Sequence, residues 1–315
     1  SWIGQVPEGV LSEGTSTEVI ASALAELTAE PLPGLPPLTG GLVGALGWDT
    51  LYDWEPTLSR EAPGELTTPD AALCLVSDMV AVDHHEGVVW LMSNAVNADN
   101  RDAGAEAAYD AAVERLSAMA ADLSTPVPLH AVKIGDAPTA QPVLRTPRED
   151  FERAVDEGKE AIREGEVFQV VLSQRADVEC TADPFDVYRV LRTVNPSPYM
   201  YYLRLADGTG GDFSVVGSSP ETLIRLTAGT LTMFPIAGSR PRGETDEADA
   251  ELERELLNDP KELSEHVMLV DLGRNDLAKV CVPGTVEVTT LMEVKRYSHI
   301  MHISSTVTGR LAAGR

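Results

Sequence analysis

The irregular order of strand-like and helix-like segments constrains the fold of this chain most strongly. A doubly wound parallel sheet places a helix after nearly every strand. Here one strongly acidic helical pattern, 249–270, interrupts a series of short apolar runs that are typical of strands. These runs lie at 167–172, 200–205, 213–216, 223–226, 231–236, 286–289 and 300–307. The order therefore favours an α+β fold over a doubly wound sheet.

The best internal boundary is 124–147, a Gly- and Pro-punctuated stretch that is the longest one without clear periodicity. We expect residues 1–123 to form an N-terminal part of the fold, 124–147 to act as a linker, and 148–315 to form the catalytic part. A chain of 315 residues buries about three quarters of its unfolded surface, so a full core is available.

Local patterns predict the elements on both sides of this boundary. Residues 70–94 read as two strands joined by a turn, and the Ala-rich segment 103–123 reads as a helix. Residues 146–149 resemble a capping box with Pro147 at the first helical position. The helix that follows is expected to end near Gly165.

Charge and composition exclude several classes of partner. The formal net charge of −26 argues against binding to nucleic acid or to an anionic membrane surface, because both need a basic face. No apolar run approaches the roughly 20 residues that cross a bilayer, and no secretory leader opens the sequence. The scattered cysteines Cys74, Cys180 and Cys281 are typical of reduced core thiols. We therefore expect a soluble, cytoplasmic protein.

Two carboxylates three residues apart, Glu262 and Glu265, form the sharpest local pattern. On a helix they share one face, and the apolar run after them indicates that this helix end is buried. Buried carboxylates need a cation or a proton to offset their repulsion, and an all-oxygen site suits Mg²⁺. The alternative is a solvated face of an acidic helix, which the spacing alone favours.

Two further candidates follow strand-like runs. A partly buried Glu221 could act as a general acid, although by itself it also reads as an ordinary turn residue. Gly238 would let backbone N–H groups approach a ligand, and Ser239 could donate to it. Arg240 and Arg242 could hold carboxylates, but an ordinary exposed loop would look much the same.

Two polar residues interrupt apolar strands. His302 shares a strand face with Ser304, and a lone histidine in a strand is more often a satisfied core residue than a catalyst. Gln169 either has a buried partner or faces a site, and the spacing does not choose between these. The sequence lacks the usual phosphate-loop, dinucleotide-binding, zinc-protease and serine-hydrolase motifs, so those functions lose support.

Six longer segments occur in a fixed order. They are FQVVLSQR (168–175), NPSPYMYYLRL (195–205), VGSSPETLI (216–224), PIAGSRPRG (235–243), DPKELSEHVMLVDLGRNDLAKVC (259–281) and VKRYSHIMHISSTVTG (294–309). Together they resemble the chorismate-utilising enzymes, and most closely the family of anthranilate synthase component I. The resemblance is strong over about 146–309 and weaker over 33–97.

The resemblance implies an α+β fold with β-sheets around a chorismate site and helices outside. It also implies Mg²⁺ and a glutamine amidotransferase subunit, component II, that supplies ammonia. Ammonia would add at C2 of chorismate as the C4 hydroxyl leaves. Elimination of pyruvate would then give anthranilate, for tryptophan biosynthesis.

The resemblance also suggests roles for metal-binding and catalytic residues. Glu265 looks like a magnesium ligand, with Glu262 beside it on the metal-site helix. Glu221 looks like the acid that assists departure of the hydroxyl. His302 matches the active-site histidine of the family.

Four positions bear on the substrate and the product. Gly238 and Ser239 match the pair that contacts chorismate, with Ser239 where the family usually has threonine. Gln169, which we also expect at the substrate, stands where relatives that add water carry a lysine base. Ala237 stands where aminodeoxychorismate synthases carry a nucleophilic lysine. Both substitutions point to anthranilate chemistry or to its non-eliminating relative, aminodeoxyisochorismate synthase.

Pro198, Tyr199 and Met200 match the segment that contacts tryptophan as a feedback inhibitor, but the Leu-Leu-Glu-Ser motif that completes that site is not in the sequence. The family's second metal glutamate, Gly-rich loop and chorismate-binding arginine and tyrosine would follow Arg315. We therefore expect this chain to be a portion of a longer protein and to be inactive alone. A non-catalytic, truncated paralogue that docks the amidotransferase or senses tryptophan is the alternative from another class.

Overall fold

The computed structural model describes residues 15–29, 32–55, 57–59, 66, 68–97, 101–128, 132 and 140–314. These residues fall into two compact units, one that combines the residues before 130 with those from Val190 onward, and one within His130–Arg189. Helix α3 (Asp102–Ser124) ends where the predicted linker begins, and α4 (Arg148–Glu164) starts at its end. The predicted three-part organisation itself stays a prediction.

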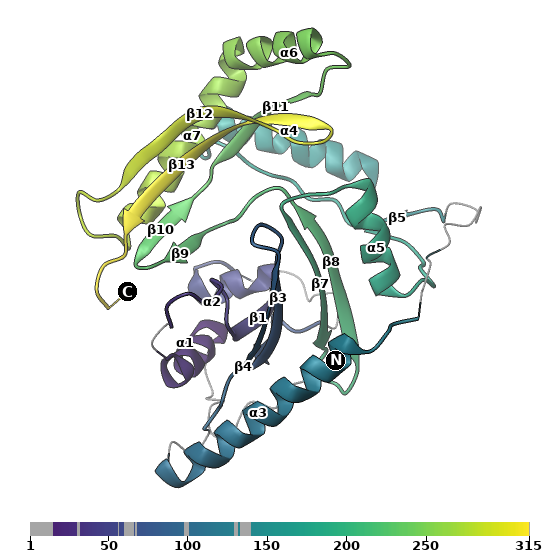
Figure 1. Cartoon of the computed structure of the whole chain (residues 1–315). Helices are drawn as coiled ribbons and strands as arrows, with labels where there is room; N and C mark the ends of the chain where they lie inside the picture. The colour runs from purple at the N-terminus through teal and green to yellow at the C-terminus, as the bar shows by residue number, and fades with distance from the viewer. Residues whose placement is uncertain are drawn as a thin grey trace. The chain divides into compact units, whose positions relative to one another are not determined.

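A five-stranded antiparallel sheet dominates the larger unit (Figure 1). Its central strand is β13 (Ile300–Arg310), which pairs along one edge with β12 (Glu287–Arg296). Along the other edge β13 pairs first with β11 (Ile236–Pro241) and then with β10 (Thr230–Met233). Strand β9 (Arg225–Thr227) completes the sheet beside β10.

Helices α6 (Asp246–Asn258) and α7 (Pro260–Ala278) pack against one face of this sheet (Figure 1). The core lies between these two layers, because β13 directs alternate side chains toward the helices. One cluster consists of Leu256, Met301 and Ile303, and a second of Leu231, Val270, Leu277, Cys281 and Val307.

Two predicted elements are each split in the structure. The acidic pattern 249–270 is wrong as a single helix, because Asp259 caps α7 and Pro260 opens it. A residue before proline disfavours the helical conformation, so α6 ends there. The run 231–236 is divided between β10 and β11 around Pro235, which has no N–H to donate to a strand ladder.

The segment 70–94 forms three strands rather than the predicted two. Strand β2 (Ala71–Val76) pairs with β1 (Gly41–Leu46), whereas β3 (Asp78–Asp83) forms a hairpin with β4 (Val88–Ser93). An apolar run does not reveal such a change of partner at Ser77. The unit also contains β7 (Tyr199–Ala206) paired with β8 (Asp212–Ser219), helices α1 (Ser16–Leu27) and α2 (Leu51–Trp54), and a short 3₁₀ turn, η1 (Trp48–Thr50).

The smaller unit contains α4 and the pair β5 (Val143–Leu144) with β6 (Ala176–Asp177), and α5 (Pro184–Val194) crosses its boundary. Helix α4 ends at Gly165, as predicted, with φ at +79°. The predicted capping box is wrong: Pro147 is the N-cap, and no side chain caps the helix.

The strand predicted at 167–172 is also wrong. Its residues belong to no strand, and Phe168 and Val171 are exposed. An apolar run becomes a strand only beside a hydrogen-bonded partner, and no other described residues pair with this one.

The antiparallel sheets with helices on one side confirm the predicted α+β class. In the described part of the chain, no helix is both long and apolar enough to cross a bilayer. The three cysteines are free thiols, but the prediction of core positions holds for Cys281 and is wrong for the exposed Cys180.

Candidate active site

The two faces of β13 carry different chemistry. Met301, Ile303 and Ser305 face the helices and are fully buried. His302 and Ser304 alternate with them and face the other side. The pairing register places Ser239 directly opposite His302, so the side chains of these two predicted site residues share that face.

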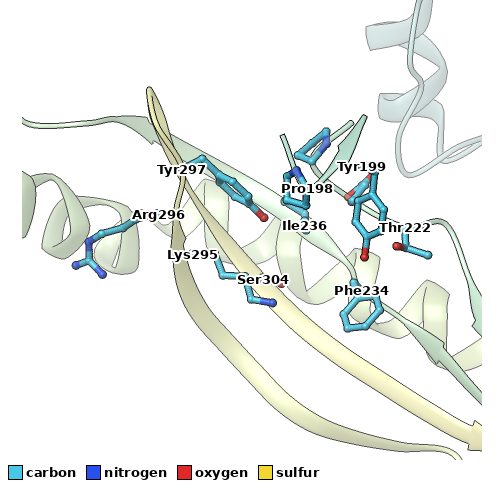
Figure 2. Close-up of a pocket in the computed structure, with 11 residues that line it drawn as sticks. Pro198, Tyr199, Thr222, Phe234, Ile236, Lys295, Arg296, Tyr297 and Ser304 are labelled. Carbon is cyan, nitrogen blue, oxygen red and sulfur yellow. The ribbon is translucent and has the colours of Figure 1, made fainter. Parts of the chain in front are cut away.

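A pocket of about 410 Å³ opens on this side of the sheet (Figure 2). It brings together residues from the start of β7, the turn after β8, the β10–β11 junction and the strands β12 and β13. Its lining consists of Pro198, Tyr199, Pro220, Glu221, Thr222, Phe234, Ile236, Lys295, Arg296, Tyr297 and Ser304.

Glu221 is the titratable carboxylate of this pocket. The turn that holds it is fixed by the hydroxyl of Ser219, which lies 3.1 Å from the Glu221 carbonyl oxygen and 3.4 Å from its backbone nitrogen. Partial burial raises the pKa of the Glu221 carboxyl above its ordinary value, and the neighbouring His302 partly opposes that shift. A carboxyl with a raised pKa keeps its proton to higher pH, as a general acid requires.

Tyr297 lies beside both of these groups. Its ring meets the His302 ring edge-on, with centroids 5.8 Å apart. Burial raises the pKa of Tyr297, and the nearby Glu221 and Tyr199 raise it further. Pro198 and Tyr199, predicted to contact tryptophan, thus line the same pocket as Glu221, whereas Met200 is not part of its lining.

Gly238 occupies a β-bulge between Ala237 and Ser239, with φ at +82°. A Cβ atom at this position would lie 3.2 Å from Cδ1 of Ile303 and 3.3 Å from Oε2 of Glu262. Only glycine adopts this backbone conformation without strain. The bulge therefore lets α7 bring the Glu262 carboxylate against the strand that carries Ser239.

A buried histidine holds this arrangement in place. His266 has no exposed surface, and its Nδ1 and Nε2 lie 3.2 Å from the Ala237 carbonyl oxygen and 2.6 Å from the Ser305 Oγ. A carbonyl only accepts, so Nδ1 carries the proton and Nε2 accepts the Ser305 hydroxyl proton. Ser305 in turn accepts the N–H of Met292, at 3.0 Å. Burial lowers the pKa of His266, which favours this neutral ring.

Met292 itself sits at an irregularity of β12 with φ at +57°. The hydrogen-bonded chain from Ala237 through His266 and Ser305 to Met292 therefore joins both bulged strands to α7. Sequence reasoning missed this network, since its partners are distant in sequence.

The predicted magnesium ligands Glu262 and Glu265 both lie on α7, one turn apart and partly buried. Mg²⁺ commonly binds proteins through one or two carboxylates, with water and substrate oxygens completing its shell. This pair fits that mode of binding, although Arg240 Nη1 lies 4.0 Å from Oε1 of Glu262. Among the described residues there is no cluster of three or more groups that could hold a metal ion.

Arg240 and Arg242, which the sequence suggested as possible carboxylate binders, form ion pairs with acidic residues of the protein itself. Arg240 donates to Glu255 and Asp259, each at 2.8 Å. Arg242 donates to both oxygens of Asp249, at 2.8 and 3.0 Å. These contacts tie β11 to α6 and to the start of α7, so they support the fold beside the site.

Gln169 belongs to the other unit, so its place at the site stays a prediction. The pocket also contains residues that the sequence did not single out as site residues: Thr222, Phe234, Ile236, Lys295, Tyr297 and Ser304. Strand alternation was the available signal for Ser304, because it shares a face with His302.

The comparisons with known proteins agree with one another. The family profile described as chorismate binding enzyme matches residues 5–315. Anthranilate synthase component 1 of Arthrobacter globiformis is 49% identical over 316 residues, covering 99% of this chain and 59% of that protein. The protein of that name from Mycolicibacterium smegmatis is 48% identical, with the same two coverages.

Among solved structures, the crystal structure of anthranilate synthase component I from Streptococcus pneumoniae TIGR4 matches with a TM-score of 0.76 and 31% identity. The match covers 92% of this chain and 60% of that one. The chain thus spans about 60% of the length of the relatives it matches. Because the family profile covers nearly all of it, this chain belongs to the family of chorismate binding enzymes.

Proposed function

We propose that the protein is component I of an anthranilate synthase, which converts chorismate and ammonia to anthranilate, pyruvate and water. The observation that carries this proposal is the 49% identity over 99% of the chain to a protein of that name. The pocket supports it, because one wall offers a carboxyl with a raised pKa beside a histidine.

In the proposed reaction ammonia forms a bond to C2 of chorismate while the bond from C4 to its hydroxyl breaks. Glu221 gives its proton to the departing oxygen, so water leaves rather than hydroxide. This proton transfer leaves Glu221 as a carboxylate. His302 lies next to Glu221, and a positive charge on its ring would stabilise that carboxylate. Loss of the C2 proton and of the enolpyruvyl group as pyruvate then restores the aromatic ring.

Other residues of the chain orient the substrate in this proposal. Gly238 exposes backbone at the bulge, and Ser239 presents its hydroxyl on the face of His302. Ala237 offers only a methyl group, so no covalent intermediate forms there. We place Gln169 at the substrate as well, where it supplies no base.

We further propose Mg²⁺ as the cofactor, held by Glu265 with Glu262 beside it. When bound, it would supply positive charge for a substrate carboxylate. A glutamine amidotransferase subunit would deliver the ammonia, and tryptophan would inhibit through Pro198, Tyr199 and Met200. The net charge of −26 supports a protein without a nucleic-acid or anionic-membrane partner. We also propose a cytoplasmic location.

The test is turnover of chorismate by the complete protein as its host produces it, with Mg²⁺ and ammonium. Anthranilate is expected, detected by its fluorescence and mass. A product that keeps both its amino group and its enolpyruvyl group would show a non-eliminating synthase instead. Tryptophan binding without any turnover would show a non-catalytic paralogue.

A further inference from the structure

The phenol hydroxyl of Tyr297 is a hydrogen-bond donor that is available inside the pocket. The side chain is half-buried and lines the pocket, and Figure 2 shows its hydroxyl end directed inward, toward Pro198 and Ile236. Within the described part of the chain, Tyr297 forms hydrogen bonds through its backbone and a ring contact, but none through its phenol oxygen. A buried tyrosine usually bonds its hydroxyl to a partner. This hydroxyl is therefore free to bind a molecule that occupies the pocket.

Three contacts hold Tyr297 in place. Its N–H donates to the Ile300 carbonyl, at 2.8 Å, across the turn between β12 and β13. Its own carbonyl accepts from Nη1 of Arg242, also at 2.8 Å, and Asp249 holds that arginine in turn. Its ring meets the edge-on ring of His302. A donor that is fixed in this way needs no reorganisation when charge develops beside it, which is the condition for electrostatic catalysis.

The acid of the pocket is a neighbour of this hydroxyl. Burial raises the pKa of Tyr297, and the charges of Glu221 and Tyr199 raise it further, so the phenol and the Glu221 carboxyl lie within electrostatic range of each other. A tyrosine with a raised pKa keeps its proton at neutral pH and is a donor rather than a base. Two groups that carry protons, the Glu221 carboxyl and the Tyr297 phenol, thus lie in the same part of the pocket.

The other donors that line the pocket are less suited to a ligand beside Glu221. The Oγ of Ser304 and the Oγ1 of Thr222 are unpartnered within the described residues, but each has less than 1 Å² of accessible surface. The Nζ of Lys295 lies over the Phe234 ring, 5.8 Å from its centroid. The guanidinium of Arg296 bonds Asp249 and points away from the pocket in Figure 2.

We propose that Tyr297 is a further catalytic residue of this pocket, whose hydroxyl donates a hydrogen bond to the oxygen that leaves C4 of chorismate. The proposal rests on the proposed function, which places Glu221 at the same oxygen. A hydroxyl oxygen has two lone pairs and can accept from both groups. As the C4–O bond breaks, its electron pair goes to the oxygen, Glu221 supplies the proton, and water leaves. Tyr297 keeps its own proton and stabilises the charge that builds on the oxygen.

The test is Tyr297→Phe in the complete protein, because this change removes the hydroxyl and keeps the ring against His302. Tyr109→Phe is the matched control, since Tyr109 is 62% exposed on α3. A hydrogen bond to a group that carries charge is typically worth about 10- to 100-fold. Tyr297→Phe should lower kcat by that factor and keep the KM for chorismate within about threefold, because the charge develops only in the transition state. The control should change neither constant by more than about twofold.

Two further readouts distinguish this role from a structural one. Titration calorimetry with chorismate, without ammonia, should give Tyr297→Phe an affinity within about threefold of wild type. The fall of kcat with rising pH should stay at the pH of the wild type. A hydroxyl that bonded Glu221 instead of the substrate would favour the carboxylate, so its loss would move this fall to higher pH. A displacement of more than about half a pH unit, or a kcat within about threefold of wild type, would overturn the proposal.

The products separate this proposal from the proposed function. A wild type that releases an aminated product with its enolpyruvyl group would overturn the function. That product has also lost the C4 oxygen, so slow consumption of chorismate by Tyr297→Phe would still support the role of Tyr297. A variant that consumes chorismate as fast as the wild type but accumulates such a product would overturn the proposal, since the hydroxyl would then act in the loss of pyruvate.

Discussion

The Nε2 of His266 and the Oγ of Ser305 are joined by a 2.6 Å hydrogen bond inside the protein. His266 lies on α7 directly after the proposed magnesium ligand Glu265, and Ser305 lies on β13, the strand that carries His302. This contact therefore fixes the position of α7 relative to β13.

Replacing His266 by alanine should destabilise the fold. The change leaves a cavity and removes partners from the Ala237 carbonyl and the Ser305 hydroxyl, so we expect a loss of about 2–4 kcal/mol in the free energy of unfolding. Urea unfolding measures it. His85→Ala is the control, because that side chain is 94% exposed. Equal stability of the two variants would contradict the structural role of His266.

Replacing Gly238 by alanine should impair both stability and turnover. The positive φ costs about 1–2 kcal/mol for a residue with a Cβ, and the new methyl would crowd Ile303 and Glu262. Gly229→Ala is the matched control, because its φ is +76° but nothing lies within 4 Å of a Cβ there. Both variants should share the strain, and only Gly238→Ala should lower kcat/KM. Equal kcat/KM values would show that the close approach to Glu262 is irrelevant.

Glu221→Gln tests the proposed acid. General acids typically contribute about 10²- to 10⁴-fold, so kcat should fall by at least about 100-fold while the KM for chorismate changes little. In the wild type, kcat should fall as pH rises through the raised pKa of Glu221. A kcat within a few-fold of wild type would remove Glu221 from the mechanism.

Glu221→Gln should make the fold more stable at neutral pH, although it lowers turnover. Because the folded-state pKa of Glu221 is raised, its protonation favours the folded state at pH below the unfolded value of about 4.5, and this contribution is lost as pH rises through the folded pKa. The neutral glutamine does not have this pH dependence. Glu221→Gln should therefore match the wild type in acid and exceed its stability at neutral pH, measured by thermal unfolding.

The ion pairs of Asp249 should make the free energy of unfolding depend on pH in acid. Its carboxylate accepts from Arg242, from the Gly243 N–H and from Arg296, and these partners hold the pKa of Asp249 well below its ordinary value. Its contribution is present above the unfolded value of 3.8 and lost as pH falls toward the folded pKa. Asp249→Asn should be less stable than the wild type at pH 7 and should lose less stability in acid.

The control for this prediction is Asp271→Asn, because Asp271 and its partner Arg274 are both more than half exposed. Exposed ion pairs contribute about 0–1 kcal/mol, so this variant should keep the wild-type profile. Similar acid profiles for the two variants would argue against the Asp249 network.

Glu265→Gln should weaken the dependence on magnesium. Loss of one charged ligand should raise the Mg²⁺ concentration for half-maximal turnover by at least about tenfold. Glu251→Gln, an exposed acid of α6, should leave it unchanged. An unaltered magnesium requirement in Glu265→Gln would place the metal elsewhere.

Local patterns predicted much of the sheet and of the site. The alternation at 300–307 correctly placed His302 and Ser304 on one face of β13, and the spacing of Glu262 and Glu265 correctly placed them on one helix. Proline has no N–H for a strand ladder and disfavours a helical residue before it, so Pro235 and Pro260 were signals for the two breaks. The hydrophobic pattern, however, continued across both prolines.

What the sequence could not predict depends on partners that are distant along the chain. Arg242 donates hydrogen bonds to Asp249 and to the Tyr297 carbonyl in the loop before β13. His266 is hydrogen-bonded to Ser305. These contacts form only when α6 and α7 pack on the sheet. The orphan hydroxyl of Ser304 is visible only when every other buried group has been matched to a partner. Spacing does not contain that information.

The most direct test of the central claim is the product formed from chorismate and ¹⁵N-labelled ammonium by the complete protein with Mg²⁺. The account predicts fluorescent anthranilate carrying the label, with one pyruvate released per anthranilate, and loss of both in Glu221→Gln. Chorismate converted to an unlabelled product, or to a labelled one that keeps its enolpyruvyl group, would contradict it.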